Sequence, residues 1–422
     1  MNYKDCLDYL NEIDKKYGIS PGTENVAELF GCVKKPYRGM HIIHVAGTNG
    51  KGSVSSFITY MLNELGYKVG RYVSPVTDGY REKIQYMYKN KVTYISEDEV
   101  AQYITALKPY VDVIQNSAFE IETVMAFMAF KEWECDYIVL ECGLGGLHDA
   151  TNAIEEKDLC VFTSISEDHK AYLGDDVCKI AENKSGIMRY DTCNISSAQK
   201  ESVKEVLCKK AKENRSSIIF PSEYRIIKSG ICGNEFEYDG EIWETKLCGT
   251  YQIDNAVTAI EAVKALFRND SIDVDKLKKG LVKTVWNNRF QIVQQRPYVV
   301  IDGAHNPDAA AKLACSLNNI FGREKYKRIG IMGVFSDKDV KGILHELSNS
   351  FDEMHIVKAP GKRGLKTEKL SEYIKDIMHI VPECHDKCAK EVIKYVTDNI
   401  SEGDKDRTVV VIYGSLSLLA GN

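Results

Sequence analysis

A glycine-rich segment around Lys51 contains the residue types that a phosphate-binding loop needs. Glycines lie on both sides of Lys51 in the sequence GTNGKGS, and Ser53 follows directly. Glycines let backbone N–H groups turn toward an anion, a lysine supplies a mobile cation, and a serine hydroxyl can bind Mg²⁺. The pattern predicts a site for a nucleoside triphosphate, although Val45 replaces the first glycine of the usual Walker A pattern and Gly52 separates the lysine from the serine. The alternative interpretation is a glycine-rich turn without a ligand.

Two polar residues that could bind metal follow apolar segments further along the chain. Glu141 comes directly after DYIVL, and His169 lies just beyond LCVFTSI. The carboxyl ends of parallel strands meet at one edge of a sheet, so both side chains would converge on the crevice that contains Ser53. A carboxylate suits Mg²⁺, whereas histidine is an unusual ligand for this ion. His169 could therefore equally be a histidine of a surface loop.

A second polar group lies in the C-terminal part of the chain. Asp302, His305 and Asn306 follow the apolar segment YVVI, and Arg289 precedes it. A nucleotide bound between two domains would account for both features, with Arg289 screening phosphate charge. An arginine in a hinge is equally often only the partner of a salt bridge.

The residues around Lys51 require a strand before the loop and a helix after it. Apolar residues precede the loop from His41 onward, and helical periodicity follows Ser53 as far as Leu65. Strands and helices continue to alternate along the chain, which predicts an α/β fold with a doubly wound, mostly parallel sheet. Residues 216–248 instead contain short alternating segments with glycine turns, which are typical of a small antiparallel sheet.

A second α/β cycle begins after the pattern breaks between Thr284 and Pro297. We therefore predict two domains, a phosphate-loop domain over residues 1–287 and a smaller, Rossmann-like α/β domain over residues 288–422.

The composition is that of an ordinary soluble globular protein. The net charge of −6 and the scattered basic residues argue against nucleic acid as a partner. Early charges such as Lys4 and Asp5 argue against a signal peptide, and no apolar run approaches the roughly 18 residues of a membrane span. Thirteen cysteines without a paired framework predict a reduced, cytoplasmic protein, and we expect a monomer.

Three residues near the C-terminus have a spacing that partly matches a metal site. They are Cys384, His385 and Cys388. A zinc site of this kind needs a second pair of ligands with suitable spacing, and the sequence shows none. We therefore favour an interpretation without metal.

Several motifs, in one order along the whole chain, resemble those of the folylpolyglutamate synthases and the related bifunctional dihydrofolate synthases, the folate branch of the Mur ligases. They are IHVAGTNGKGS, DYIVLECGLGG with DATN, SISEDH, NKSGI, GTYQIDNA, WNNRF, DGAHNP and YGSLSLLAG. The Lys-Gly-Ser of the phosphate loop is specific to this branch, because the loop of the Mur enzymes resembles GKT.

This resemblance implies an ATP-dependent amide ligase that adds L-glutamate to a folate or to dihydropteroate through an acyl phosphate. It implies ATP contacts at Gly47, Thr48, Asn49, Gly50, Lys51, Gly52, Ser53, Asn255, Arg289 and Asp302. It implies one Mg²⁺ on Ser53 and Glu141 and a second on Glu141, His169 and a carbamylated Lys184. Lys51, Lys184 and His305 are the implied catalytic residues, Ser74, His305 and Ser415 the glutamate contacts, and Asp149 the pterin contact.

The chain also departs from the family pattern at several positions. Leu147-His148 replaces Arg-Leu, Asn183 replaces Glu, Asn287-Asn288 replaces Pro-Gly, and Val76 replaces a frequent His. None of these positions is a predicted metal or phosphate ligand. The departures near Leu147 and Asn183 leave a paralogue that binds nucleotide without ligating as one alternative. A Mur-type ligase acting on a peptidoglycan precursor is a second alternative, which Gly52 disfavours.

Overall fold

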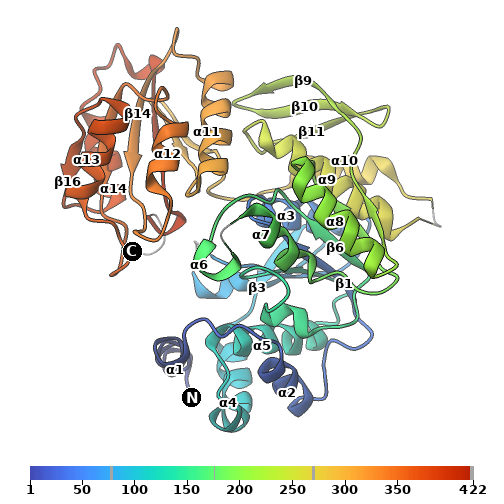
Figure 1. The fold of residues 1–422 in the computed structure, drawn as a ribbon. Coiled ribbons are helices and arrows are strands. Elements are labelled where there is room, and N and C mark those ends of the chain that lie inside the picture. Colours follow the sequence, from blue (N-terminus) through green and yellow to red (C-terminus); the bar gives the residue numbers. More distant parts are fainter. Residues whose placement is uncertain (77–78, 175, 269–270, 419–422) are drawn as a thin grey trace. The chain divides into compact units, whose positions relative to one another are not determined.

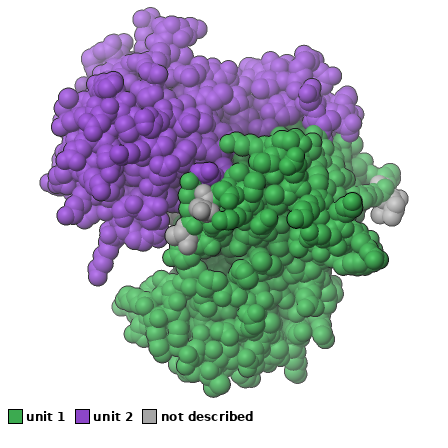
Figure 2. Space-filling model, viewed as in Figure 1, with its two compact units in different colours: residues 1–165, 170–221, 255–283 green, residues 166–169, 222–254, 284–422 purple. Residues whose placement is uncertain are grey.

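The computed structural model describes residues 1–76, 79–174, 176–268 and 271–418 (Figure 1). The chain forms two compact units, which Figure 2 shows in different colours. Unit 1 consists of residues 1–165, 170–221 and 255–283. Unit 2 consists of residues 166–169, 222–254 and 284–422.

Unit 1 contains an eight-stranded sheet in the order β4-β3-β2-β5-β1-β6-β7-β8. Its strands are β1 His41–Ala46, β2 Val69–Tyr72, β3 Ile84–Tyr88, β4 Lys91–Tyr94, β5 Tyr137–Glu141, β6 Leu159–Phe162, β7 Cys193–Ser196 and β8 Ser217–Ile219. The six neighbouring strands β2-β5-β1-β6-β7-β8 all pair parallel. At one end of the sheet, β3 pairs antiparallel with both β2 and β4. The predicted mostly parallel sheet is therefore confirmed.

Helices cover both faces of this sheet, as consecutive residues of β2 demonstrate. A Cβ at Gly70 would meet Phe130 of α5, whereas Arg71 donates a hydrogen bond of 2.8 Å to Ser56 of α3. Neighbouring residues of a strand point to opposite faces, so α5 and α3 lie on opposite sides. The helices up to residue 283 are α1 Tyr3–Tyr17, α2 Glu24–Cys32, α3 Lys51–Glu64, α4 Glu97–Ile114, α5 Ala118–Glu132, α6 Lys170–Leu173, α7 Val177–Ser185, α8 Glu201–Glu213, α9 Tyr251–Leu266 and α10 Val274–Lys283. None of the helices in the described ranges is long and apolar enough to cross a membrane.

The hairpin formed by β3 and β4 was not predicted from the sequence. Its two-residue turn consists of Lys89 and Asn90, which have φ values of +49° and +62°. Positive φ at both central residues matches the right-handed twist of the strands, and asparagine tolerates this conformation. The pair Lys-Asn between alternating apolar residues is a weak signal, since the usual marker of such a turn is Asn-Gly.

Unit 2 contains a small antiparallel sheet in the order β11-β10-β9. These strands are β9 Arg225–Gly230, β10 Gly233–Tyr238 and β11 Glu241–Thr245. They confirm the antiparallel sheet predicted within residues 216–248, apart from its beginning. Residues Ser217–Ile219 instead form β8, which extends the large sheet by pairing parallel with β7.

The larger sheet of unit 2 has the order β12-β13-β17-β14-β15-β16. Its strands are β12 Gln291–Gln295, β13 Tyr298–Ile301, β14 Lys327–Met332, β15 Glu353–Val357, β16 Glu383–His385 and β17 Thr408–Tyr413, and its helices are α11 Pro307–Ile320, α12 Val340–Glu346, α13 Thr367–Met378 and α14 Ala389–Asp398. The pairings from β13 to β16 are parallel, and β12 pairs antiparallel with β13. The predicted second α/β unit is confirmed. Its two edge strands escaped prediction because β12 is mostly polar and β16 is only three residues long.

Candidate active site

The loop between β1 and α3 has the backbone geometry of an anion-binding site. Helix α3 begins at Lys51, and its N-cap Gly50 has a φ of +93°, with no capping side chain among the described residues. A Cβ at Gly50 would lie 2.4 Å from Asn255 Oδ1, so this position excludes larger residues. The uncapped N–H groups of the first turn and the helix dipole both favour a bound anion. The structure also places predicted Asn255 against the loop.

Two lysine side chains converge on the carbonyl oxygen of Gly47. Lys51 Nζ lies 3.2 Å from this oxygen, and the buried Lys184 Nζ lies 2.9 Å from it. Lys51 Nζ is also 4.0 Å from Oε1 of Glu141, the last residue of β5. Glu141 pairs in register with Val45, just before the loop, so the sheet itself places this carboxylate beside the phosphate loop. Four predicted residues of unit 1 therefore lie together.

Ser53 lies in the first turn of α3, and its hydroxyl is buried without a described hydrogen-bond partner. The residue is 1% exposed, and its Oγ has no hydrogen-bond partner among the described residues. A buried polar atom without a partner carries a free-energy cost, so such atoms commonly mark a place where a ligand or ion supplies the partner. The hydroxyl is therefore available to a bound cation or phosphate.

Asp149 is engaged in holding its own loop together. Its Oδ2 accepts a hydrogen bond of 2.7 Å from the N–H of Leu144, and its Oδ1 accepts one of 3.0 Å from the N–H of Thr151. Burial raises the pKa of Asp149 above its ordinary value. Any contact with a pterin would thus come from a side chain that already shapes the loop. Ser74 lies half-buried, two residues beyond the end of β2.

Asp302 follows β13 in unit 2 and is surrounded by donors. Its Oδ2 accepts hydrogen bonds from Tyr251 Oη at 2.9 Å and from the N–H of Phe290 at 2.8 Å. Burial raises the pKa of Asp302, while the guanidinium of Arg289 acts in the opposite direction. A Cβ at Gly303, the residue after Asp302, would lie 2.6 Å from Arg289 Nη1. The structure therefore places two of the predicted unit 2 residues, Arg289 and Asp302, close together.

His305 belongs to a compact network of charged groups within unit 2. Its Nδ1 lies 2.7 Å from the carbonyl oxygen of Gly303, and its Nε2 lies 3.3 Å from Asp168 Oδ2. Asp168 also accepts hydrogen bonds from Lys338 Nζ at 2.7 Å and from Asn306 Nδ2 at 3.0 Å. Burial raises the pKa of Asp168, but the hydrogen bond and charge of His305 and the charge of Lys338 outweigh burial and hold the pKa below its ordinary value. The network orients the His305 ring.

The remaining predicted residues of unit 2 have less defined surroundings. His169 belongs to the short segment 166–169, and its Nε2 lies 3.9 Å from Asp168 Oδ2. Ser415 follows β17, and its hydroxyl lies 2.7 Å from that of Ser417.

Two family models match most of the chain. The model of the Mur ligase middle domain matches residues 45–263, and that of the Mur ligase glutamate ligase domain matches residues 288–416. A dihydrofolate synthase/folylpolyglutamate synthase of Mycobacterium tuberculosis is 31% identical over 384 residues, which are 84% of this chain and 77% of that protein. The chain belongs to the Mur ligases. Within them it is a member of the folylpolyglutamate and dihydrofolate synthases.

Further members of this family are similar over nearly their full length. The dihydrofolate synthase/folylpolyglutamate synthase of Bacillus subtilis is 29% identical over 96% of this chain and 95% of that protein. A folylpolyglutamate synthase of M. tuberculosis, solved with ADP and AMPPCP, has a TM-score of 0.87 and 30% identity, with 98% of each chain covered. E. coli FolC, solved with DHPP and ADP, has a TM-score of 0.85 and 27% identity, covering all of this chain and 96% of that one.

The structure explains one departure from the family pattern and links two others. Asn288, at the position where the family pattern predicts a glycine, has a φ of +60°, a conformation that asparagine tolerates. The N–H of Leu147 donates a hydrogen bond of 2.8 Å to the carbonyl oxygen of Asn183, so two of the positions that depart from the family pattern are in direct contact through their backbones. Leu147 is 45% exposed. The loop therefore presents an apolar side chain to solvent at this position.

Two charged residues of the His305 network were missing from the predicted site. Asp168 is part of SISEDH, but the family resemblance implied a metal contact only for the adjacent His169. Lys338 follows β14 in the sequence FSDKDV, which is an ordinary polar loop in composition. A polar loop after an apolar strand was the available signal, and it is shared by many loops without function.

Proposed function

We propose that this chain uses ATP to join the amine of L-glutamate to a carboxylate of a folate-type substrate. The observation that carries the proposal is the buried, orphaned Ser53 hydroxyl in the helix turn that begins with Lys51. The family supports it, since relatives named dihydrofolate synthase/folylpolyglutamate synthase match nearly the whole chain. One solved member contains Mn, AMPPNP and L-glutamate.

Residues of the phosphate loop would bind the triphosphate of ATP. The uncapped N–H groups at the start of α3 would donate to phosphate oxygens, and Lys51 would exchange its contact with the Gly47 carbonyl for one with phosphate. Gly47, Thr48, Asn49, Gly50 and Gly52 provide the remaining backbone of this proposed site. We also retain Asn255, Arg289 and Asp302 as proposed ATP contacts.

The donor set of unit 1 fits a divalent cation that prefers oxygen. Ser53 offers a hydroxyl that has no hydrogen-bond partner in the part of the chain that the structure describes, and Glu141 offers a carboxylate that is 6% exposed. A bound Mg²⁺ would neutralise phosphate charge and polarise the transferred phosphoryl group. We propose Ser53 and Glu141 for one ion, and we retain the predicted second ion on Glu141, His169 and Lys184.

Lys184 has the position that a carbamylated lysine would require. Its side chain is buried, and its Nζ reaches the phosphate loop at the Gly47 carbonyl. A neutral amine that adds to CO₂ loses one proton and becomes a carbamate, which replaces a cation by an anionic oxygen donor. We propose this modification because an unmodified ammonium beside a metal site would repel the ion.

The proposed reaction proceeds in two steps. The γ-phosphoryl group of ATP moves to the substrate carboxylate and ADP leaves, which gives an acyl phosphate. The amine of L-glutamate then attacks the acyl carbon, and phosphate leaves through a tetrahedral intermediate. Lys51 would stabilise the negative charge of the phosphoryl group during the first step.

We propose that His305 acts on the glutamate side of this reaction. Asp168 and the Gly303 carbonyl fix the orientation of its ring, so Asp168 is a positioning residue. Ser74 and Ser415 are further proposed glutamate contacts, and Asp149 is a proposed pterin contact.

Three further expectations from the sequence are retained as proposals. We propose a domain boundary near residue 287, because the two family models match residues 45–263 and 288–416 on either side of it. All thirteen cysteines are free, which supports a reducing, cytoplasmic location. We also propose that the chain acts as a monomer.

Phosphate release from ATP tests the proposal. The full chain with Mg²⁺ and L-glutamate receives dihydropteroate, a reduced folate monoglutamate or a UDP-muramyl substrate in parallel reactions. We expect stimulation by one or both folate-type substrates, which also reveals whether both activities are present. Stimulation by the UDP-muramyl substrate alone, or by none of the three while ATP still binds, would refute the proposal.

A further inference from the structure

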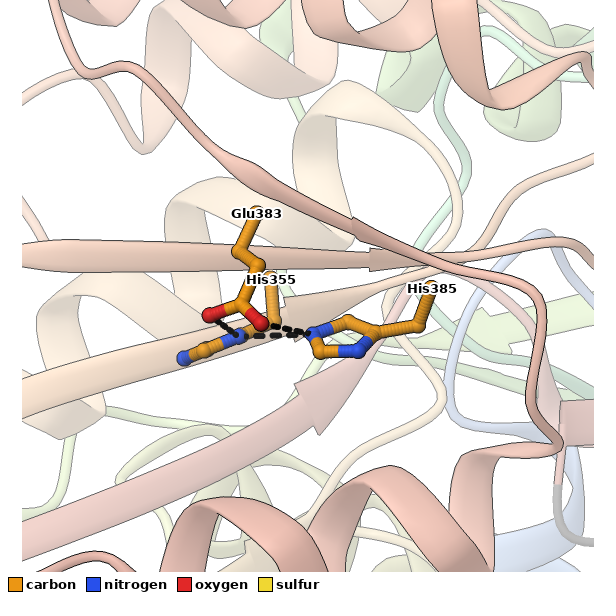
Figure 3. Close-up of side chains that lie close together, drawn as sticks. All are labelled: His355, Glu383 and His385. Atoms are coloured by element: carbon orange, nitrogen blue, oxygen red, sulfur yellow. Dashed lines mark hydrogen bonds and ion pairs between the residues drawn. The ribbon is translucent and has the colours of Figure 1, made fainter.

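Two histidines and a glutamate meet on the larger sheet of unit 2 (Figure 3). His355 Nδ1 lies 2.9 Å from His385 Nε2. The Glu383 carboxylate faces both rings, with one oxygen 3.6 Å from His355 Nδ1 and the other 3.8 Å from His385 Nε2. Three potential metal ligands therefore point at one small volume.

The register of two parallel strands brings these residues together. His355 of β15 is the register partner of Glu383 of β16, and His385 lies two residues beyond Glu383. Residues two apart in a strand share a face of the sheet, so all three side chains lie on one face. Cys384 points to the opposite face for the same reason. Of the pattern Cys384, His385 and Cys388 noted in the sequence, only His385 therefore belongs to this cluster, and its neighbours there are His355 and Glu383.

Hydrogen bonds prepare the His355 ring to act as a ligand. Its Nε2 lies 3.0 Å from Glu353 Oε1, and the second oxygen of this carboxylate accepts a hydrogen bond of 2.7 Å from Lys327. An ionised carboxylate only accepts hydrogen bonds, so the Nε2 of a neutral His355 ring carries the hydrogen and its Nδ1 carries a lone pair. A carboxylate behind a coordinating histidine is the usual arrangement in metal proteins, because it fixes the ring and its tautomer.

We propose that His355 Nδ1, His385 Nε2 and Glu383 bind a divalent transition-metal ion, with Zn²⁺ as the best match. Ligands at about 2.0–2.1 Å from a tetrahedral zinc ion lie roughly 3.3 Å from one another. The two nitrogens lie 2.9 Å apart, and one ligand atom from each of the three residues can be chosen so that all three lie within 4.8 Å of one another, so small side-chain movements would bring them to this spacing. The ion replaces the hydrogen bond between His355 Nδ1 and His385 Nε2. His385 then adopts the tautomer that carries its hydrogen on Nδ1, which leaves the Nε2 lone pair free to coordinate.

The surroundings suit an ion that enters from solvent. The His355 and His385 side chains are 3% and 9% exposed, while Glu383 is 50% exposed and opens the site to water. The cluster borders a groove of about 360 Å³ that is also lined by Tyr395 and Asp404. Imidazole favours Zn²⁺ over Mg²⁺, which prefers oxygen ligands.

This site is separate from the chemistry proposed for unit 2. His355 of β15 lies level with Ile412 of β17, because both are register partners of Ile331 in β14. Asp302 and Ser415 follow the carboxyl ends of β13 and β17. In the order β12-β13-β17-β14-β15-β16, the ligand strands β15 and β16 lie two and three positions from β17, which is roughly 10–14 Å at the usual spacing of neighbouring strands, so the two locations are separated across the sheet.

The expected role of the ion is to attach the edge strand β16. This strand has only three residues and pairs with β15 on one side alone. Two of the ligands come from β16 and one comes from β15, so the ion connects the two strands through their side chains. Binding to the folded state alone raises the temperature of unfolding.

Titration of the metal-free full chain with Co²⁺ tests the proposal. Excess Mg²⁺ occupies the oxygen-ligand sites, a reducing agent keeps the cysteines as thiols, and absorption spectra distinguish nitrogen and oxygen ligands from thiolates. We expect one Co²⁺ with visible d–d bands, no thiolate charge-transfer band, and displacement by Zn²⁺. His385→Ala and the exposed Glu383→Gln should each weaken binding by at least tenfold and abolish the metal-dependent rise in Tm, with unchanged far-UV circular dichroism. Cys384→Ser and Cys388→Ser are matched controls that should bind as the unmodified chain does.

Three results would overturn the proposal. They are an unmodified chain without a tight Co²⁺ equivalent, equal binding by the two ligand variants, and a thiolate band that disappears in Cys384→Ser or Cys388→Ser.

Discussion

Replacing Ser53 with alanine should separate folding stability from catalysis, because the Ser53 hydroxyl is buried without a described hydrogen-bond partner. An unsatisfied buried hydroxyl costs about 1–3 kcal/mol, and alanine has a helix propensity better by roughly half a kcal/mol. We expect the free energy of unfolding of Ser53→Ala to rise by about 1.5–3.5 kcal/mol and the Tm by about 2–4 °C. Urea and thermal unfolding, followed by circular dichroism, measure these changes.

The same substitution removes an oxygen donor that we propose for Mg²⁺. We expect kcat/KM for ATP to fall about 100-fold, which corresponds to about 2.7 kcal/mol of transition-state stabilisation. The phosphate-release assay with the preferred folate substrate measures the loss.

Ser55 provides a matched control in the same helix. Its Oγ is also buried without a described partner, but two residues along a helix change the direction of a side chain by about 200°. Ser55→Ala should therefore gain similar stability and keep its activity. Wild-type kcat/KM in Ser53→Ala, or an equal loss in Ser55→Ala, would refute the reasoning.

Three other substitutions test the loop and the charged network. Gly50→Ala should cost about 1–2 kcal/mol of stability and weaken ATP binding, because φ is +93° and the new Cβ would lie 2.4 Å from Asn255 Oδ1; unchanged affinity in calorimetric titration would contradict this. Lys184→Ala should abolish phosphate release while circular dichroism stays unchanged, and near-normal turnover would exclude Lys184 from a metal site. Asp168→Asn should lower the free energy of unfolding at pH 7 by roughly 2 kcal/mol, because His305 loses a charged partner. Burial raises the Asp168 pKa, but its partners hold it below the ordinary 3.8, so the carboxylate stabilises the fold above about pH 4 and this contribution shrinks in acid. An equal difference between variant and wild type at about pH 7 and pH 3 would contradict that assignment.

The phosphate loop was predictable because its information is local. Apolar residues before the loop, glycines within it and helical periodicity after it lie within 25 consecutive residues, 41–65. The strand and helix form as predicted, and Gly50 has the positive φ that its residue type permits. The parallel order of the neighbouring strands then places Glu141 beside Lys51, as the rule for carboxyl ends of strands predicts.

The network around His305 was only partly predictable, because its members come from different loops. Asp168 and Lys338 are 170 residues apart in the chain, and neither stands out in composition. A charged loop residue becomes functional through what lies opposite to it, and a single sequence does not contain that information.

The residue types, their periodicity and the motif order by themselves determined the fold class, the phosphate loop and the family of this chain. Each of these depends on neighbouring residues or on short segments that carry their own conformational preference. The tertiary structure alone decided that Ser53 is orphaned, that Asp149 is engaged within its loop, and that His385 faces His355 rather than a cysteine. Those facts depend on burial and on the register between distant strands, where a shift by one residue would move every side chain to the other face of the sheet.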